Sequence, residues 1–304
     1  MIVVVCPGQG SQTPGFLTPW LAEPGAEALL AQLSEAAEVD LLTHGTVSDA
    51  DTIRDTAIAQ PLIVAASLLS LTALRARTDV PVAAIAGHSV GEFAAAAGAG
   101  VISPVDALQL VGLRGRAMAS AAAEVATGMS AVVGGDQESV VAHLEGLSLS
   151  PANFNGGGQI VAAGPLDALA TLRENPPAGA RVIPLQVAGA FHTNFMASAV
   201  ETVRAAASSV PATDPNALLW TNRDGSVVTS GSEFVELMVG QIASPVRWDL
   251  CMAGFAEHGV TGVIELAPAG ALVGLAKRGL PGVPTVAVKT PEDLQAAADL
   301  LSAE

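Results

Sequence analysis

The chain has 304 residues and carries 13 Lys and Arg against 29 Asp and Glu, which gives a formal net charge of −16. This balance excludes a protein that binds nucleic acid through clustered positive charge, because such binding displaces counterions from phosphates. Half of the residues are hydrophobic and none is Tyr, so disorder is excluded and an aliphatic core is expected.

The first third of the chain alternates strands and helices, which is typical of a parallel sheet covered on both faces. Residues 3–6 are predicted as a strand that leads into the glycine-rich loop 7–10. A second strand is predicted over 82–86, followed by the apolar helical stretch 93–99. We therefore expect an α/β fold.

An uncharged stretch over residues 56–74 approaches the length of a membrane span, and the mean hydropathy of the chain is +0.49. Because Gln60, Pro61 and further polar residues interrupt it, a buried helix of a soluble protein is the better interpretation. No Lys or Arg precedes the apolar run at the N-terminus, so it lacks the charged region of a signal peptide, and we expect a cytoplasmic protein without a membrane segment. Cys6 and Cys251 lie in apolar patterns without metal-ligand spacing and are predicted as buried thiols, so we expect no metal site.

The middle of the chain contains a compact series of short elements. Ser103, Pro104 and Asp106 predict a helix start, and this helix is expected to end near Val125. The elements that follow are strand 130–133, helix 137–144, strands 153–155 and 159–163, helix 166–173 and strand 182–187. The order βαββαβ predicts a ferredoxin-like subdomain over 122–193, inserted into a large domain formed by 1–121 and 194–304.

The sequence Gly87-His88-Ser89-Val90-Gly91 fits the pattern G-x-S-x-G between a predicted strand and a predicted helix. There the two glycines permit a sharp turn that exposes the serine, and the helix N-terminus favours developing negative charge. A nucleophilic Ser89 is therefore the favoured interpretation over a tight turn with an incidental serine.

A nucleophilic serine needs a base within hydrogen-bond reach. His192, in Gly189-Ala190-Phe191-His192, lies where the small subdomain returns to the large one, and such a cleft favours catalytic groups. The alternative is His258, which with Asp214, Asp224 or Asp249 would give the residue order of an α/β-hydrolase. His258 precedes Gly259 at an expected helix end, where the helix dipole already explains it, so we favour His192.

Arg114 shares one helical face with Leu110 and Met118. An arginine in that setting either extends to solvent or is buried to bind an anion, and the residues alone leave both open. An acyl-transfer serine would favour binding of a substrate carboxylate.

Five motifs occur in an order that resembles the malonyl-CoA:acyl carrier protein transacylases. They are Gly8-Gln9-Gly10-Ser11-Gln12, the run GHSVGE at 87–92, Arg114, the run GAFH at 189–192 and the run QIASPVRW at 241–248. The resemblance covers nearly the whole chain. It implies an α/β-hydrolase-like large domain with a ferredoxin-like insertion, no cofactor, and a monomer whose partners are malonyl-CoA and an acyl carrier protein.

The resemblance also implies roles for individual residues. Ser89 would attack the malonyl thioester with His192 as base, through a malonyl-serine ester and two half-reactions. The backbone N–H groups of Gln9 and Val90 would form the oxyanion hole, and a main-chain carbonyl near Gln241 would orient the histidine.

The remaining implied roles concern the acyl group. Arg114 would bind the malonyl carboxylate, Met118 and Phe191 would line the acyl pocket, and His88 and Asn155 would lie close to the site. Phe191 and Val90 match the residues that accompany malonyl rather than methylmalonyl in related domains. A serine carboxylesterase or thioesterase on the same turn is the alternative, and it would need a functional His258–Asp pair.

The acidic charge is unevenly distributed. Residues 1–53 contain seven acids and no Lys or Arg, whereas 241–289 contain four basic residues against three acids. Since carrier proteins are generally acidic, we expect a local basic rim, with Lys277 and Arg278 as the candidates for docking the carrier or the phosphates of CoA.

Overall fold

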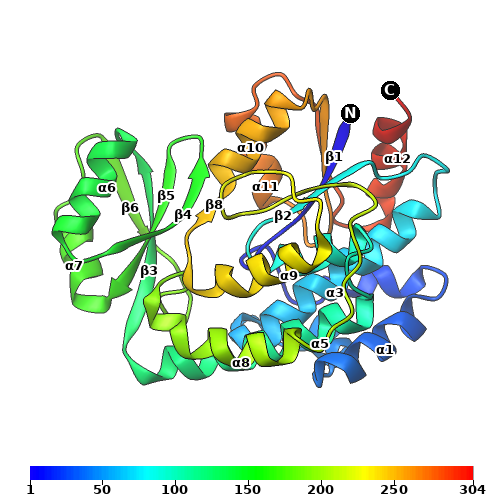
Figure 1. Cartoon of the computed structure of the whole chain (residues 1–304), viewed down its shortest axis with the longest axis horizontal. Helices are drawn as coiled ribbons and strands as arrows, with labels where there is room; N and C mark the ends of the chain where they lie inside the picture. The colour runs from blue at the N-terminus through cyan, green and yellow to red at the C-terminus, as the bar shows by residue number, and fades with distance from the viewer. Residues whose placement is uncertain (304) are drawn as a thin grey trace.

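The computed structural model describes residues 1–303 and contains two β-sheets (Figure 1). The first sheet is parallel and has the order β10-β9-β1-β2-β7. Its strands are β1 (Ile2–Cys6), β2 (Ala84–Gly87), β7 (Leu218–Trp220), β9 (Gly262–Glu265) and β10 (Thr285–Ala287). The registers Cys6 with Gly87 and Ala86 with Trp220 place the carboxyl ends of β1, β2 and β7 side by side, and that edge carries the site.

Helices cover both faces of the parallel sheet, as the sequence pattern predicts. The α-helices of this large subdomain are α1 (Ala26–Ala37), α2 (Leu41–Thr46), α3 (Thr56–Arg75), α4 (Gly91–Gly98), α5 (Pro104–Glu124), α8 (Ala197–Ala207), α9 (Gly231–Gly240), α10 (Trp248–Glu257), α11 (Ala271–Gly279) and α12 (Leu294–Ser302). The 3-10 segments are η1 (Thr18–Ala22), η2 (Thr52–Arg54), η3 (Asn194–Met196), η4 (Gln241–Ala243) and η5 (Pro291–Asp293).

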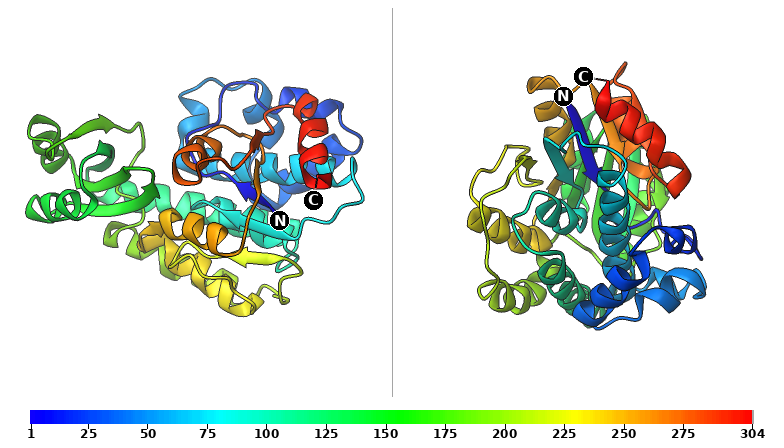
Figure 2. Two further views of the ribbon diagram at one scale, coloured as in Figure 1. Left: turned by 90° about the horizontal axis from the view of Figure 1, so that it is seen from above. Right: turned by 90° about the vertical axis from the view of Figure 1, so that its right-hand side faces the viewer.

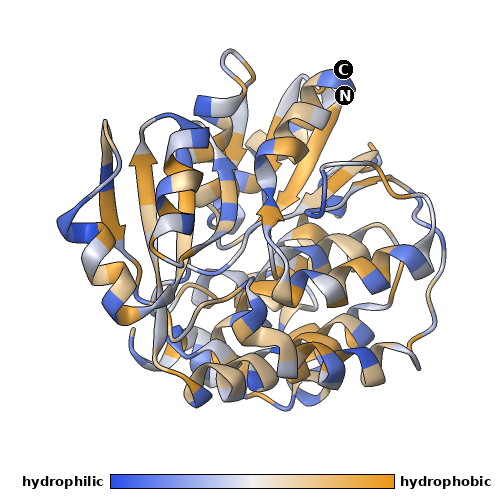
Figure 3. Cartoon of the chain, turned by 60° about the vertical axis from the view of Figure 1, so that its left-hand side comes forward, coloured by the Kyte–Doolittle hydropathy of each residue, from blue (hydrophilic) through white to orange (hydrophobic). Residues whose placement is uncertain are grey.

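The side chains of β1 alternate between two hydrophobic clusters. Val4 and Cys6 pack with α3, α4 and α5, whereas Val3 and Val5 pack with α10 and α11. Strand β1 is accordingly apolar along its length, and the strands of the parallel sheet are mostly coloured as hydrophobic in Figure 3. Burial on both faces explains why the strand reads as a continuous apolar run rather than an alternating one. Cys6 and Cys251 are buried and free, as predicted.

Helix α3 is the uncharged stretch that raised the question of a membrane span. Among residues 1–303 it is the one helix that is long and apolar enough to cross a membrane. Of its most apolar 18-residue segment, 83% is buried inside the molecule. It packs against α5 and α4 in the core of the large subdomain. The prediction of a buried helix is therefore confirmed.

The second sheet has the order β6-β3-β5-β4-β8 and forms the small subdomain, which is a separate lobe in Figure 2. Its elements are β3 (Thr127–Gly134), α6 (Gln137–Gly146), β4 (Ser150–Gly156), β5 (Gln159–Pro165), α7 (Leu166–Glu174) and β6 (Ala180–Pro184). The connection βαββαβ with this strand order is ferredoxin-like, as predicted. The fifth strand, β8 (Val246–Arg247), comes from the large subdomain and pairs in parallel with β4.

The ends of several elements differ from the predicted ones. Helix α5 begins at Pro104 and the Ser103 side chain accepts a hydrogen bond from Asp106 N–H, as expected. In contrast, the strands predicted over 82–86 and 182–187 are β2 and β6, which end at Gly87 and Pro184. Pairing with neighbouring strands sets these ends, and the local amino-acid composition does not show which residues will be paired. The subdomain boundaries at 122 and 193 stay a prediction.

Candidate active site

Ser89 lies in a sharp turn between the end of β2 and the start of α4. Its backbone has φ 53°, in the left-handed region that non-glycine residues rarely adopt. A Cβ at Gly87 would lie 2.1 Å from the carbonyl carbon of Gly91, and one at Gly91 would lie 2.2 Å from the carbonyl oxygen of Cys6. Both glycines of the motif are therefore required by close approach of the backbone.

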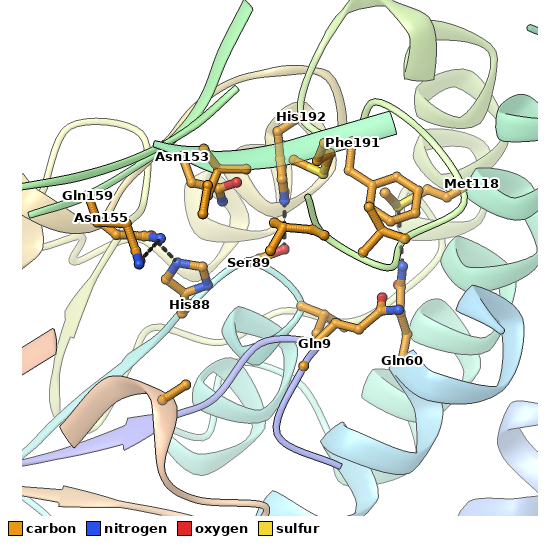
Figure 4. Close-up of a pocket in the computed structure, with 18 of the residues that line it drawn as sticks. Gln9, Gln60, His88, Ser89, Met118, Asn153, Asn155, Gln159, Phe191 and His192 are labelled. Atoms are coloured by element: carbon orange, nitrogen blue, oxygen red, sulfur yellow. Dashed lines mark hydrogen bonds between the residues drawn. The ribbon is translucent and has the colours of Figure 1, made fainter. Parts of the chain in front are cut away.

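His192 is hydrogen-bonded to Ser89 and is the base that the sequence favoured. The distance from Ser89 Oγ to His192 Nε2 is 2.7 Å (Figure 4). The distance from His192 Nδ1 to the carbonyl oxygen of Gln241 is 2.8 Å. A carbonyl only accepts, so Nδ1 carries the hydrogen and Nε2 is free to accept the Ser89 proton. This arrangement suits general-base activation of a serine, with a main-chain carbonyl in place of a carboxylate.

The imidazole of His192 is held in its neutral form. Burial lowers the pKa of His192 to about 3, and the positive charge of Arg114 acts in the same direction. The bond to Gln241 acts against this shift because it stabilises the charged imidazolium. His192 is therefore available as a proton acceptor throughout the neutral range.

The alternative base, His258, lies outside the cavity. Its Nδ1 donates to the carbonyl of Gly254, 2.8 Å away at the end of α10, and its ring packs edge-on against Trp220. The hydrogen bond and the ring contact account for this side chain without catalysis. The geometry needed for a His258–Asp pair with Ser89 is thus not present.

Ser89 opens into a cavity of about 310 Å³ between the two subdomains. The large subdomain and the segment that leads into it contribute Gln9, Gly10, Gln60, His88, Ser89, Val90, Arg114, Met118, Phe191, His192 and Ala271; the small subdomain and the segment that follows it contribute Met129, Ala131, Asn153, Asn155, Gln159, Val161, Leu185 and Val187. About half of these residues are apolar and the others are polar or charged, and a small-molecule site combines both kinds of lining.

Two backbone N–H groups near Ser89 are free to hold an oxyanion. The glycine loop after β1 passes directly beside the turn, since a Cβ at Gly8 would lie 2.9 Å from His88 Nδ1. Within residues 1–303, the N–H groups of Gln9 and Val90 donate no hydrogen bond, whereas the N–H of Ser89 donates to Asn222 Oδ1 at 2.7 Å. Donors of this kind stabilise negative charge that develops on a carbonyl oxygen.

Arg114 is buried, with 1% of its surface exposed, and lines the same cavity. Its Nη1 donates to Gln60 Oε1 at 2.6 Å and its Nη2 to Gln241 Oε1 at 3.2 Å, while Nε has no hydrogen-bond partner. Burial lowers the pKa of Arg114 to about 10, so the guanidinium remains charged at neutral pH. A buried cation held by neutral amides and facing a cavity is suited to bind an anion.

The same network contains the carboxyl group of Glu92, which is also buried. Its oxygens accept hydrogen bonds from the backbone N–H of Asn222 at 2.6 Å and from the Gln241 side-chain amide. Burial raises the pKa of Glu92 to about 8, and the hydrogen bonds and Arg114 oppose that rise. Glu92 is therefore separated from Arg114 by Gln241 and leaves the guanidinium open toward the cavity.

The side chain of His88 points away from Ser89 and toward the small subdomain. Its Nε2 lies 2.9 Å from Asn155 Oδ1, and Asn155 Nδ2 donates to Gln159 Oε1 at 2.9 Å (Figure 4). Burial lowers the pKa of His88, and the hydrogen bond to Asn155 opposes the shift. A neutral His88 thus links the turn to β4 and β5 of the small subdomain.

The structure brings nine of the predicted site residues to one cavity: Gln9, His88, Ser89, Val90, Arg114, Met118, Asn155, Phe191 and His192. Gln241 does not line the cavity. Its carbonyl oxygen accepts a hydrogen bond from His192 Nδ1, as expected. Lys277 and Arg278 are exposed at the end of α11 and lie outside the cavity lining; Arg278 packs against Gly157 in the turn between β4 and β5.

Sequence reasoning missed Gln60, Glu92 and Asn222. Gln60 is 2% exposed and accepts a hydrogen bond from Arg114. The sequence feature that could have indicated this role is a polar residue within an apolar run. Glu92 ends the GHSVGE motif on the first turn of α4. Asn222 had no local signal beyond following an apolar segment.

The fold and the site define an acyl transferase: residues 3–291 match the family described as "Acyl transferase domain", to which the chain belongs. Malonyl CoA-acyl carrier protein transacylase from Mycobacterium tuberculosis H37Rv is 53% identical over 99% of this chain and 100% of the relative. The corresponding protein of Escherichia coli K12 is 32% identical over 97% of this chain and 98% of the relative.

Solved structures agree with these relatives. The crystal structure of MCAT from Mycobacterium tuberculosis has a TM-score of 0.95 and 53% identity, and covers 98% of this chain and 99% of its own. The solved structure of a type II PKS acyl-carrier protein in complex with its malonyl-transacylase contains a chain that matches this one with a TM-score of 0.91 and 29% identity. The match covers 98% of this chain and 99% of that chain. This chain is accordingly a member of the malonyl CoA-acyl carrier protein transacylases, so the predicted family, fold and enzyme class are confirmed. The esterase alternative is not favoured.

The low pKa of His192 predicts a pH profile. A base of ordinary histidine pKa, about 6.5, would lose about tenfold of its neutral form between pH 8 and 5.5. Because the pKa of His192 is lowered to about 3, the rate at which a serine-directed fluorophosphonate labels the protein should stay nearly constant over that range. The measurement is labelling rate against pH, with Ser89→Ala as the site control. A midpoint near pH 6.5 would contradict the neutral, buried imidazole.

Proposed function

We propose that this protein transfers the malonyl group of malonyl-CoA to the phosphopantetheine thiol of an acyl carrier protein, through a malonyl ester on Ser89. The observation that carries the proposal is the buried Arg114 in the same cavity as the hydrogen-bonded pair Ser89 and His192. The pair supplies an acyl-transfer nucleophile, and the arginine selects an acyl group that ends in a carboxylate. The names of the relatives support the same substrates.

In the first half-reaction, Ser89 Oγ attacks the thioester carbonyl of malonyl-CoA. The hydroxyl proton passes to His192 Nε2, and the negative charge that forms on the carbonyl oxygen is held by the N–H groups of Gln9 and Val90. When the carbon–sulfur bond breaks, His192 returns the proton to the departing thiolate. The products are CoA and malonyl-Ser89.

In the second half-reaction, the carrier's thiol takes the place of CoA. His192 accepts the thiol proton, the thiolate attacks the ester carbonyl, and Ser89 Oγ leaves with the proton from His192. The Gln241 carbonyl holds the imidazole in one tautomer through both steps. Water must be kept from the ester, and the apolar lining supplied by Met118, Phe191 and Val161 serves this purpose.

Selection for malonyl follows from charge and size. A malonyl carboxylate would pair with Arg114, whereas an acetyl group would leave the guanidinium buried without a counterion beside the acyl chain. Met118 and Phe191 limit the space around the acyl carbon, and Val90 and Phe191 carry the residue types that accompany malonyl. A pocket excludes one extra methyl by only about 1–3 kcal/mol, so methylmalonyl would be a slower substrate rather than a forbidden one.

We further propose that the protein acts in the cytoplasm as a monomer, bound neither to a membrane nor to nucleic acid. The net charge of −16 supports the last point. The burial of α3 inside the large subdomain supports the proposal that this helix does not enter a membrane.

The central test is intact mass after mixing with malonyl-CoA. The wild-type protein should gain one malonyl group, and Ser89→Ala should gain none, because the ester oxygen is Ser89 Oγ. Release of CoA without a retained ester would instead support a hydrolase.

The carboxylate role of Arg114 is tested by comparing two acyl donors. Arg114→Ala should lower malonyl transfer by about 30-fold or more, since loss of a buried charge pair costs about 2–5 kcal/mol. Acetyl transfer should fall far less, because acetyl has no carboxylate. Arg116→Ala is the matched control, as Arg116 contacts Glu38 and the Ala37 carbonyl on the outer side of the same helix. Equal losses for both donors with Arg114→Ala would remove the selective role.

We propose that Lys277 and Arg278 dock the acidic carrier or the phosphates of CoA. Six arginines form ion pairs within residues 1–303, whereas Lys277 and Arg278 form none and are exposed. Arg278 lies beside the turn of the small subdomain that contains Gly157, while Ala271 at the other end of α11 lines the cavity. This helix therefore presents two uncompensated cations near the cleft.

Reversing both charges tests this docking role. Lys277→Glu with Arg278→Glu should slow capture of the carrier by about tenfold or more at low salt, and the difference should shrink at high salt. The measurement is kcat/KM for carrier and for malonyl-CoA against ionic strength. Arg173→Glu on α7 is the matched control. Unchanged values for both substrates would exclude the docking role.

A further inference from the structure

Asn222 follows β7 at the carboxyl edge of the parallel sheet and is completely buried. Its side-chain amide spans the turn that carries the nucleophile: Oδ1 accepts from Ser89 N–H at 2.7 Å, and Nδ2 donates to the Gly87 carbonyl at 2.7 Å. One rigid planar group thus bonds the backbone on both sides of His88. The amide thus satisfies one backbone donor and one backbone acceptor of the turn.

The same side chain belongs to a hydrogen-bond network that reaches Ser89, His192 and Arg114. Asn222 Oδ1 also accepts from Gln241 Nε2 at 3.2 Å, and the Asn222 backbone N–H donates to Glu92 at 2.6 Å. Gln241 in turn accepts from His192 through its carbonyl and from Arg114 through its side chain. The nucleophile, its base and the buried cation are therefore connected through two amides, Asn222 and Gln241.

We infer that Asn222 is a positioning residue, which fixes the strained turn so that Ser89 Oγ is aimed at His192 and Val90 N–H is left free for the oxyanion. This inference rests on the proposed role of Ser89 as nucleophile. Asn222 does not line the cavity, so it acts on the reaction only through the residues it holds.

Backbone strain explains why such a clamp is needed. A non-glycine residue in the left-handed region costs about 1–3 kcal/mol and persists only where its surroundings enforce it. By accepting from Ser89 N–H, the amide also prevents that donor from turning toward the substrate in place of Val90 N–H. Without the clamp, the turn can relax and Oγ can move away from Nε2.

Two variants separate positioning from folding. Asn222→Asp keeps the shape of the side chain and the acceptor for Ser89 N–H but removes the donor to the Gly87 carbonyl. Asn222→Ala removes both bonds. The matched control is Ser70→Ala, which also leaves a buried backbone N–H, that of Ala267, without its partner, but has no hydrogen bond to the turn or to Asn222.

The readout is single-turnover formation of malonyl-Ser89, followed by intact mass, together with KM for malonyl-CoA and thermal unfolding. Displacement of a reacting atom by about 1 Å costs about 100-fold, so kcat for acylation should fall 10- to 100-fold in both variants. KM should remain close to the wild-type value because Arg114 and the cavity lining are retained. Ser70→Ala should lose thermal stability and keep its acylation rate.

The outcomes are distinguishable. An unchanged acylation rate in folded Asn222→Asp, or a loss matched by an equal rise in KM, would overturn the positioning role. If Asn222→Ala does not fold, Asn222→Asp alone decides the question. Absence of a malonyl ester on the wild-type protein would instead overturn the proposed function, so the two failures cannot be confused.

Discussion

The bond between Ser89 Oγ and His192 Nε2 forms because two backbone segments adopt left-handed conformations at the same place. Ser89 has φ 53° and His192 has φ 60°. Each is costly for a residue with a side chain, and each is enforced by its surroundings. Close approach of Gly87 and Gly91 to neighbouring backbone fixes the first, and the Gln241 carbonyl anchors the ring of the second. The cavity, the oxyanion donors and the buried cation are arranged around this pair.

The second constraint is the placement of charge in an apolar interior. Arg114 and Glu92 are both 1% exposed but do not pair directly, and the Gln241 side chain lies between them. A direct ion pair would satisfy the guanidinium and remove its reason to bind substrate. Instead, neutral amides from Gln60 and Gln241 hold the arginine while its charge remains available to the cavity. The two-subdomain fold therefore places Ser89 and a buried cation suited to bind an anion in one cavity.

The parts of the fold and of the site that depend on a local sequence pattern could be predicted. The turn at Ser89 follows from glycines between a strand and a helix, and the ferredoxin-like order follows from alternating short elements. The ends of β2 and β6 could not be predicted, since pairing with neighbouring strands sets them. The roles of Glu92 and Asn222 were missed, because each depends on a partner far along the chain: Ser89 and Asn222 are 133 positions apart.

The sequence by itself determined the fold class and the family and favoured Ser89 as the nucleophile, because these features are encoded in short runs or in motifs that keep their order along the chain. Only the tertiary structure placed His192, and not His258, within hydrogen-bond distance of Ser89, buried Arg114 beside the cavity rather than extending it to solvent, and joined Asn222 to the turn. The physical reason is that hydrogen bonds and burial depend on distances between segments, and the sheet register and domain insertion set those distances. The local amino-acid composition does not specify these distances.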